Sequence, residues 1–352
     1  MRTRFSSTST LSLKLWDFSG TALTNLLAFI LLVAFLFPMV YMLTTAIKED
    51  EQFQDVNSPI WPARRVTFTY QGREYPIYQV PTDQGVKEWA LVNRYRQESE
   101  FVDPANPEAG LIRWVGNWRA LEGVYRPYFT LTNFATIWDV TDYPRLLRNT
   151  ALLTLISMAG VLIASIAVAY GFSRFRIPGG DVLFIIMIAT IMIPEKITLI
   201  PSYFIFVRLG ALGSWLPLIL PHLFGSAVFI FLLRQNFRSI PKDLDEAAML
   251  DGAGPLRILT YIILPQSIPV VVTIALLQFF YMWNETRMAA LYLGTNTDLY
   301  TLSFAVQNYQ SFFPPPNMLQ GSALMLMAVP VIVLFLAQRI FMHGVRVTGL
   351  EK

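Results

Sequence analysis

Four ionisable side chains lie inside strongly apolar stretches of the sequence, where an unpaired charge is costly and marks a candidate functional group. Glu195 and Lys196 follow a proline in one stretch, and Glu285 and Arg287 follow Trp283 and Asn284 in another. An aromatic face beside an amide and a carboxylate can hold a polyhydroxylated ligand. Trp283, Asn284 and Glu285 are therefore candidates for lining a substrate pathway. The alternative is that these groups only connect helices, or that the charges lie near a membrane surface.

What the sequence lacks narrows the chemistry further. It contains no cysteine and only two histidines, His222 and His343, which are far apart in the chain. Thiol nucleophiles, disulfides and metal sites are therefore not expected. The H-E-x-x-H, G-x-S-x-G and G-x-x-x-x-G-K-[ST] patterns are also absent, which argues against common hydrolases and against ATP binding by this chain. A net charge of +3 without a Lys/Arg-rich run does not favour a nucleic-acid partner.

The composition indicates a membrane protein. Hydrophobic residues make up 54% of the chain and charged residues 14%, against roughly 25% charged residues in a soluble domain. A helix that crosses the hydrocarbon core needs about 20 mostly apolar residues. Stretches of this kind lie at residues 22–46, 149–171, 182–206, 214–234, 267–292 and 320–342. We predict an all-α polytopic membrane protein with six transmembrane helices and a large extracytoplasmic insertion between spans one and two.

The distribution of Lys and Arg predicts the orientation in the membrane. Basic residues gather at the N-terminus, after spans two and four, and at the C-terminus, whereas the opposite short connections hold little more than Arg208. Both termini are therefore expected to be cytoplasmic. The first span contains Pro38 and has no small-residue cleavage site, so we interpret it as an uncleaved anchor.

This orientation divides the chain into five parts. They are a cytoplasmic N-terminus (1–21), a first transmembrane helix (22–46), an extracytoplasmic loop module (47–148), a five-helix core with a cytoplasmic loop at 235–266 (149–342), and a cytoplasmic tail (343–352).

The extracytoplasmic module has a composition typical of a soluble, aromatic-rich domain. The stretch VTFTYQGREYPIYQV (66–80) alternates on both sides of Gln71-Gly72, which predicts a β-hairpin. WVGNW (114–118) adds two tryptophans. Because Trp and Tyr are enriched at interfaces, the module is interpreted as a docking surface. A self-contained lid without a specific partner is the alternative.

The stretch DEAAMLDGAG (245–254) is a short polar segment between apolar runs. We predict that the helix containing this stretch begins a few residues earlier, with Ser239 as its cap and Pro241 in its first turn. Acidic residues then lie near the positive end of the helix dipole, which is favourable. Gly252 is expected to end the helix in a left-handed conformation.

A second helix is predicted directly after this one. Gly254-Pro255 would start it, and LRILTYII would continue it until Leu264-Pro265. Leu256, Leu259 and Ile263 recur at helical spacing and are expected to share one face. Small alanines in the first helix would let it enter a groove of another protein. An ordinary pair of helices at a membrane surface is the alternative.

The same loop resembles the EAA signature of binding-protein-dependent ABC importer permeases. The signature is carried by Glu246-Ala247-Ala248, then Gly252 after three intervening residues, and Ile262-x-Leu264-Pro265 after nine more. The stretches SIPKDLDEAAMLDGA, IPEKITLIPSYFIFVRLG, WNE and VRVTGLEK are similar to carbohydrate-uptake, maltose-type permeases, as are FTLTNFATIW and RNTALLTL. The resemblance covers nearly the whole chain except about 63–127, which looks like an insertion.

The resemblance implies a fold and a set of coupling residues. The fold is that of the six-helix ABC importer permeases, in which the EAA loop seats in a cleft of a separate ATPase subunit. The residues implied to couple to the ATPase are Asp245, Glu246, Ala247, Ala248, Asp251, Gly252 and Ala253, supported by Gly254, Pro255, Ile262, Leu264 and Pro265.

The resemblance also implies partners and a location. This chain would be a multi-pass transport subunit of the cytoplasmic (inner) membrane, not an enzyme, and would bind no cofactor. ATP and Mg would bind to a partner ATPase dimer. A second homologous permease and an extracytoplasmic solute-binding protein would complete the importer in the lipid membrane, with alternating access moving a sugar or oligosaccharide.

Three alternatives remain open at this point. Related permeases carry glycerol-phosphate or polyols, so the cargo could be a non-sugar solute. A membrane-embedded enzyme would need a catalytic constellation, which we do not find in the sequence. An ion-coupled secondary transporter would predict inverted repeats, and the two halves show none.

Overall fold

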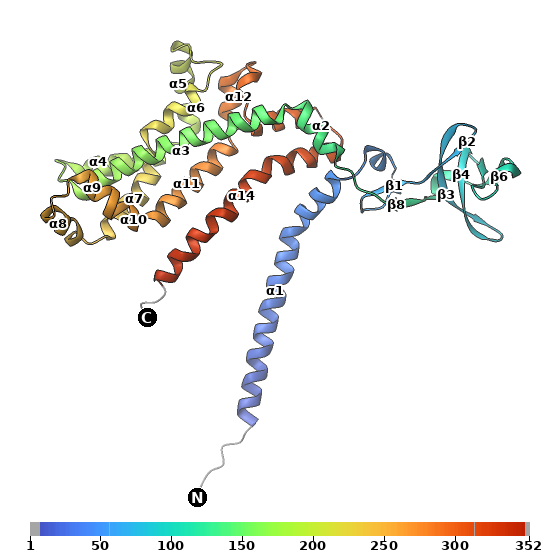
Figure 1. Cartoon of the computed structure of the whole chain (residues 1–352), viewed down its shortest axis with the longest axis horizontal. Coiled ribbons are helices and arrows are strands. Elements are labelled where there is room, and N and C mark those ends of the chain that lie inside the picture. Colours follow the sequence, from blue (N-terminus) through green and yellow to red (C-terminus); the bar gives the residue numbers. More distant parts are fainter. Residues whose placement is uncertain (1–7, 56, 313, 349–352) are drawn as a thin grey trace, which may run out of the picture. The chain divides into compact units, whose positions relative to one another are not determined.

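The computed structural model describes residues 8–55, 57–312 and 314–348 (Figure 1). The chain separates into two compact units. The first runs to Ala135 and includes Pro315–Leu324, and the second comprises Thr136–Pro314 and continues from Met325. The helices are α1 (Thr8–Ala46), α2 (Thr132–Val140), α3 (Tyr143–Arg174), α4 (Gly180–Ala189), α5 (Glu195–Arg208), α6 (Leu216–Ile219), α7 (Ala227–Ser239), α8 (Asp243–Leu250), α9 (Pro255–Ile258), α10 (Leu264–Gln266), α11 (Ile268–Trp283), α12 (Arg287–Leu293), α13 (Leu302–Ser311) and α14 (Pro316–Thr348).

The first unit begins with the long helix α1. Large apolar side chains from Leu23 to Leu43 are exposed along it, as expected of a helix that faces lipid. The side-chain amide of Asn133 donates hydrogen bonds of 2.8 Å to the carbonyls of Ala46 and Lys48. These bonds satisfy carbonyls at the C-terminal end of α1 that have no partner within the helix.

Residues 63–127 of the first unit form β-structure, so the prediction of an all-α protein is wrong for this segment. The strands are β1 (Ala63–Arg65), β2 (Thr67–Tyr70), β3 (Arg73–Thr82), β4 (Gly85–Asn93), β5 (Glu98–Val102), β6 (Ile112–Val115), β7 (Glu122–Gly123) and β8 (Tyr125–Pro127). Alternating short runs with turn residues suit an antiparallel sheet, in which one face packs and the other is solvated.

The larger sheet has the order β2-β3-β4-β5-β6, and β7 pairs with β3. The predicted hairpin is present, because Tyr70 pairs with Arg73 across Gln71 and Gly72, which both adopt positive φ. β1 pairs with β8 as a separate ribbon. One core lies on one face of the sheet and is joined by Leu121 from the connection before β7; its strand residues are Tyr78, Val80, Trp89, Leu91 and Phe101. A second, smaller cluster of Ile77, Ala90 and Val102 lies on the other face.

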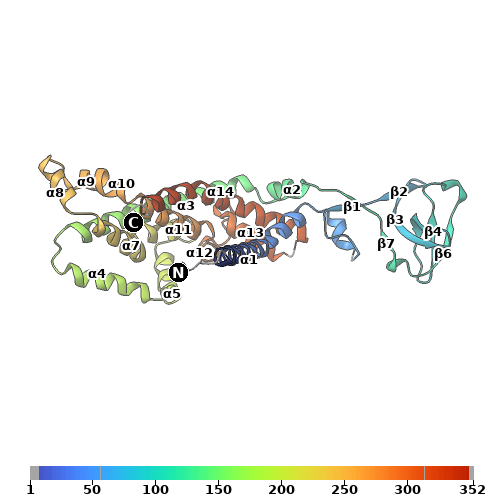
Figure 2. The same cartoon turned by 90° about the horizontal axis from the view of Figure 1, so that it is seen from below.

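The second unit is helical and is organised around α3, which contacts α7 and α11 (Figure 1, Figure 2). One apolar core lies near the C-terminal end of α3 and includes Leu233, Phe237, Ile258 and Ile263. A second core joins α3, α5 and α6 to α11, α12 and α13 through aromatic and aliphatic side chains. α3 begins before the predicted start of span two, since Pro144 is accommodated in its first turn.

The number of single straight spans differs from the prediction of six. Within the described ranges, four helices are long and apolar enough to cross a membrane, or up to six if two bent pairs each count as one span. The predicted span 182–206 is bent by 95° between residues 180–192 and 195–208. Pro194 explains this break, because a proline lacks an amide donor and pushes the preceding residue toward extended backbone. Ile193 accordingly adopts φ −77° and ψ 114°.

The predicted span 267–292 is also interrupted. Its apolar part ends with α11 at Trp283, and a separate helix, α12, begins at Arg287. A further bend of 82° separates residues 255–266 from α11. The polar residues Asn284 and Glu285 therefore occupy a break between helices, where backbone groups need side-chain partners.

Candidate functional site

The EAA loop folds as a short helix with a well-defined end. Its acidic first turn, Asp243, Asp245 and Glu246, lies at the positive end of the α8 dipole as expected. Gly252 has φ +80°, which confirms the predicted left-handed residue. Its amide donates to Met249 O (3.0 Å), and the Ala253 amide donates to Ala248 O (2.9 Å). This pair of bonds is the Schellman arrangement that closes a helix at glycine.

The start of α8 differs from the prediction. Ser239 ends α7 and its hydroxyl donates to Asn236 O (2.7 Å), so it does not cap α8. Lys242 holds the cap position without a side-chain hydrogen bond, and Pro241 precedes the helix instead of lying in its first turn. The reason is that α7 is longer than predicted. The Ser239 hydroxyl therefore bonds to a carbonyl in the last turn of α7 instead of capping α8.

Asp245 anchors α8 to the body of the second unit. Its carboxylate lies 2.6 Å from Arg174 Nε at the end of α3, and the two side chains are 7% and 6% exposed. Arg174 also donates through Nη2 to Ile240 O (3.0 Å). Removing one partner of such a buried pair leaves an uncompensated charge, so the pair fixes the position of α8 relative to α3.

The second helix of the loop packs more deeply than its sequence suggested. Gly254 caps α9 and Pro255 opens it as predicted, and the Tyr170 hydroxyl donates to Pro255 O (3.0 Å). The chain then passes through a π-helical turn, Leu259–Ile263, and remains helical to Gln266. The prediction that it stops by Leu264-Pro265 is therefore wrong, because Pro265 is tolerated in the first turn of α10.

The face predicted for the second helix also needs correction. Leu259 and Ile263 are buried, but Leu256 is 77% exposed and Ile258 takes its place in the core. The π turn changes the periodicity, so helical spacing counted from Leu256 does not hold across it.

The loop presents an exposed surface that combines carboxylates with apolar side chains. Glu246 and Ala247 are exposed. Leu250 is 90% exposed, and Met249 and Leu256 are also open. Exposed apolar residues that gather on one short element mark an interaction surface. Sequence reasoning missed Met249 and Leu250, although both stand inside the EAA stretch.

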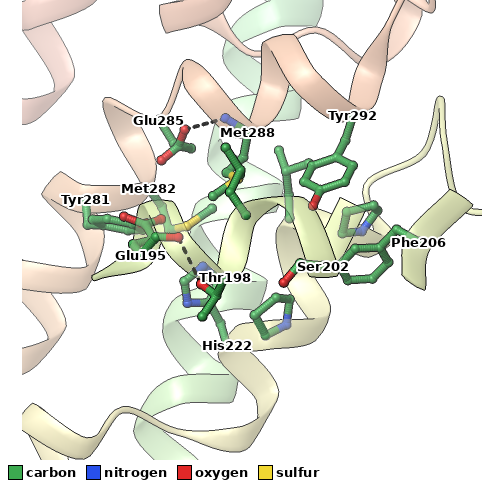
Figure 3. A pocket seen from close by; sticks show the side chains of 14 residues that line it. Glu195, Thr198, Ser202, Phe206, His222, Tyr281, Met282, Glu285, Met288 and Tyr292 are labelled. Atoms are coloured by element: carbon green, nitrogen blue, oxygen red, sulfur yellow. Dashed lines mark hydrogen bonds between the residues drawn. The ribbon is translucent and has the colours of Figure 1, made fainter. Parts of the chain in front are cut away.

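A cavity of about 180 Å³ lies between the broken helices of the second unit (Figure 3). It is lined from α5, α6 and residues 220–224, α11 and α12, by side chains that include Glu195, Thr198, Ser202, Phe206, His222, Tyr281, Met282, Glu285, Met288 and Tyr292. Glu195 lines this space directly after the break at Pro194, and Glu285 lines it directly after the end of α11. The cavity therefore combines aromatic walls with hydroxyl, imidazole and carboxylate groups.

Glu195 is the residue of the cavity wall whose carboxylate bonds to side chains from the neighbouring helices. Its carboxylate accepts hydrogen bonds from Arg287 Nη2 (3.3 Å) and from the Tyr281 hydroxyl (3.4 Å). His222 Nδ1 lies 3.2 Å from Gln278 Nε2, and its ring meets Tyr281 edge to face. Tyr281 and Arg287 thus connect α5 to α11 and α12 across the cavity. Lys196 is exposed and does not line it.

Of the three predicted pathway residues, only Glu285 lines the cavity. It is 6% exposed, and its Oε1 accepts the Met288 amide (2.7 Å) at the start of α12. Trp283 is buried, stacks on Phe279 and donates to Leu326 O (3.1 Å). The side-chain amide of Asn284 donates to Phe280 O (2.9 Å) at the end of α11.

Within the WNE stretch, Trp283 and Asn284 therefore make contacts with neighbouring backbone, and Glu285 alone lines the cavity. The lining residues His222, Tyr281 and Ser202 were not predicted, since each is a common polar residue of an apolar helix. The nearby prolines were the only signal that these segments bend. Within the described ranges, no group of three or more His, Asp and Glu side chains is arranged to hold a metal ion.

Comparison with known proteins defines the class to which this fold and loop belong. Residues 156–347 match the family described as "Binding-protein-dependent transport system inner membrane component". Because this match covers more than half of the 352 residues, the chain belongs to that family.

Relatives agree with this assignment. The chain is 31% identical over 256 residues to the osmoprotective compounds uptake permease GgtD of Synechocystis, a match covering 70% of this chain and 83% of the relative. It is 32% identical over 215 residues to the maltose/maltodextrin permease MalG of Salmonella typhimurium, covering 58% and 71%. It is 31% identical over 230 residues to the alpha-glucoside permease AglG of Rhizobium meliloti, covering 62% and 59%.

A solved structure shares the fold. It belongs to a bacterial ABC transporter involved in the import of the acidic polysaccharide alginate, with TM-score 0.65 and 18% identity. The similarity covers 96% of this chain and all of the other. The chain is a permease subunit of an ABC importer of the inner membrane and is a transport subunit rather than an enzyme, which confirms the predicted family.

Proposed function

We propose that this permease moves a sugar, an oligosaccharide or a closely related glycoside by alternating access, driven by an ATPase that docks on the EAA loop. The observation that carries the proposal is the construction of α8. Its inner side is fixed by the Asp245–Arg174 pair, and its outer side exposes Glu246, Met249 and Leu250. A rigid element with one anchored and one open side is suited to transmit motion between two proteins.

Gly252 supports this role by setting the exit from α8. Glu246, Ala247 and Ala248 would contact the ATPase cleft, and Asp251 and Ala253 would border the contact at the turn. Gly254, Pro255, Ile262, Leu264 and Pro265 would hold the loop on the permease core. ATP and Mg would bind to the ATPase dimer, so this chain would bind no cofactor itself. The loop and both termini would then lie on the cytoplasmic side.

The remaining partners are those expected of a binding-protein-dependent importer. A second homologous permease would face this one across the pathway, and an extracytoplasmic solute-binding protein would deliver the cargo. The module of residues 47–148 would lie outside and offer a docking surface. A second solved structure, of a bacterial alginate ABC transporter with 16% identity and TM-score 0.50, is described in complex with an alginate pentasaccharide-bound periplasmic protein.

A carbohydrate cargo is supported by the names of the relatives. MalG is named for maltose and maltodextrin, AglG for alpha-glucosides and GgtD for osmoprotective compounds. The cavity offers Ser202, Thr198 and Tyr281 hydroxyls beside the Glu195 carboxylate, which are suitable partners for sugar hydroxyl groups. A polyol or glycerol-phosphate remains the second candidate.

The role of the loop is tested by replacing Gly252 with valine. A Cβ at Gly252 would meet nothing within 4 Å, so the change acts through its backbone, whose φ is +80°. A β-branched residue is strained there by roughly 1–2 kcal/mol or more, which would distort the exit from α8. We expect substrate uptake to fall at least tenfold in proteoliposomes while the ATPase subunits continue to hydrolyse ATP.

Gly254→Ala is the matched control. Gly254 has φ −77° and a Cβ there would also meet nothing within 4 Å, so uptake should remain within about twofold of wild type. Uptake and substrate-stimulated hydrolysis that both stay at wild-type levels in Gly252→Val would contradict the coupling role. Binding of a panel of sugars and polyols to the cognate solute-binding protein would identify the cargo separately.

A further inference from the structure

A second cavity lies within the first unit, beside the 3-10 helix Asp50–Gln54 and the strands β1, β3 and β8. Its volume is about 600 Å³, within the range of roughly 300–1,000 Å³ that is typical of small-molecule sites. The coupling loop and the cavity of the second unit do not involve it. Guanidinium groups and aromatic rings dominate its wall, chiefly Arg64, Arg65, Arg94, Arg119, Tyr78 and Trp118.

Two of these arginines are already neutralised by carboxylates of the same wall. Arg64 forms an ion pair with Glu49, and Arg65 Nη2 lies 3.3 Å from Asp55. Burial acts to raise the pKa of Asp55, but hydrogen bonds from the Tyr125 hydroxyl and a backbone amide, together with the Arg65 charge, outweigh it and lower that pKa. Asp55 is therefore ionised at neutral pH, and these two pairs form the fixed frame of the cavity.

The other two arginines have no such partner. Arg94 and Arg119 lie 5.4 Å and 4.7 Å from the ring centre of Trp118, and neither makes an ion pair with any residue that the structure describes. A guanidinium held against an indole keeps its orientation while its N–H groups stay available for a carboxylate or phosphate. Glu51, an exposed residue, is the remaining carboxylate of the wall. After pairing, the wall carries an excess of positive charge.

A further donor belongs to the same wall. Arg65 Nε is buried and makes no hydrogen bond, although the same side chain forms the pair with Asp55. A buried donor without a partner is uncommon and marks a place where a ligand can complete the hydrogen bonding. Tyr78 and Trp118 meet edge to face at 6.2 Å and give the cavity an apolar surface as well.

We propose that this cavity binds an anionic saccharide, a sugar or short oligosaccharide that carries a carboxylate or phosphate group. The anionic group would be held by Arg94 and Arg119, since planar guanidinium groups bind such anions through paired hydrogen bonds. The sugar ring would lie against the accessible part of Trp118, whose aromatic surface complements its C–H groups, because Tyr78 is only 4% exposed and Arg65 covers its ring. The volume far exceeds the space of about 30 Å³ that one water or a small ion needs, which favours a ligand with a body over an isolated ion.

The proposal is tested on the full chain in detergent, without ATPase or ATP, by calorimetric titration. The probes are digalacturonate, the neutral disaccharide cellobiose and inorganic phosphate. We expect digalacturonate to bind, cellobiose to bind at least about tenfold more weakly, and phosphate to compete only at higher concentration. Arg94→Gln with Arg119→Gln should weaken digalacturonate binding at least about tenfold, because two charge-assisted contacts are lost.

Two further variants keep the test decisive. Arg113→Gln removes an arginine of the same module that is 72% exposed and paired with Glu98 outside the cavity, and it should bind digalacturonate as wild type does. Arg94→Lys with Arg119→Lys keeps the charge but loses the planar stacked group, and should bind with intermediate affinity. This double lysine variant also controls for a misfolded glutamine variant.

Three results would overturn the proposal. They are equal binding of the acidic and neutral disaccharides, competition by phosphate at the same concentration as digalacturonate, and absence of binding to the wild-type chain. Because no transport is measured, a failure here leaves the proposed coupling function untouched, and a failure of uptake leaves this binding site untouched.

Discussion

The EAA loop and the cavity of the second unit are built on different principles. The loop is a local structure, in which Asp243, Asp245 and Glu246 start a helix and Gly252 ends it within ten residues. The cavity collects side chains that are far apart in the sequence, such as Glu195 and Arg287. Local capping rules can therefore predict the first from sequence, whereas the second depends on how bent helices meet.

The Asp245–Arg174 pair is an exception to this difference, because it joins the locally folded loop to α3, which is distant in the sequence. Asp245→Leu would leave Arg174 buried without a counter-charge and should destabilise the folded permease by about 3–5 kcal/mol. Thermal unfolding of the purified protein would measure this loss.

The double variant Arg174→Leu with Asp245→Leu provides the control for that prediction. It should recover much of the stability, since no unpaired charge remains. Simple addition of the two single losses would show that the side chains do not act as a pair, and would make the loop a purely local element.

The cavity side of the comparison is tested at the break between α11 and α12. Glu285→Ala removes the carboxylate that accepts the Met288 amide and should cost about 1 kcal/mol, as the loss of a helix cap does. Asn284→Ala, at an exposed neighbour, should change stability by less than about 0.5 kcal/mol.

Transport measurements separate these two positions further. Glu285 lines the cavity and Asn284 does not, so substrate affinity should change in Glu285→Ala and stay unchanged in Asn284→Ala. A shift of affinity or selectivity in Asn284→Ala would restore its predicted place in the substrate pathway.

Only a small effect on stability is expected at Arg287. Its ion pair with Glu195 is half exposed, with side-chain exposures of 61% and 48%, so Arg287→Gln should cost between about 0 and 1 kcal/mol. High salt should reduce the difference from wild type, because screening weakens exposed pairs. A loss that is larger and independent of salt would show that the cavity wall is as rigidly fixed as the loop.

The sequence predicted those parts that depend on neighbouring residues. The Gln71-Gly72 hairpin, the left-handed Gly252 and the Gly254-Pro255 helix start are all present. Each follows from backbone preferences that act over a few residues.

The parts that the sequence did not predict depend on longer-range geometry. A π turn at Leu259–Ile263 interrupts the regular helical spacing, and Leu256 is exposed instead of buried. A bend at Pro194 divides one predicted span into two helices. The length of an apolar segment predicts whether it can lie in the lipid bilayer, but not whether its helix is straight. Cavity residues such as His222 and Tyr281 meet only after these bends, so no local pattern marked them.

The most direct test of the coupling claim is a disulfide or short cross-link from α8 to the ATPase. The chain contains no cysteine, so Leu250→Cys introduces a single reactive thiol at a position that is 90% exposed. Thr295→Cys, in the connection predicted to lie on the opposite side of the membrane, is the matched control. We expect Leu250→Cys to cross-link to the ATPase subunit in the assembled importer and Thr295→Cys not to do so. Absence of a cross-link from Leu250→Cys, with the importer assembled and the thiol reactive, would contradict it.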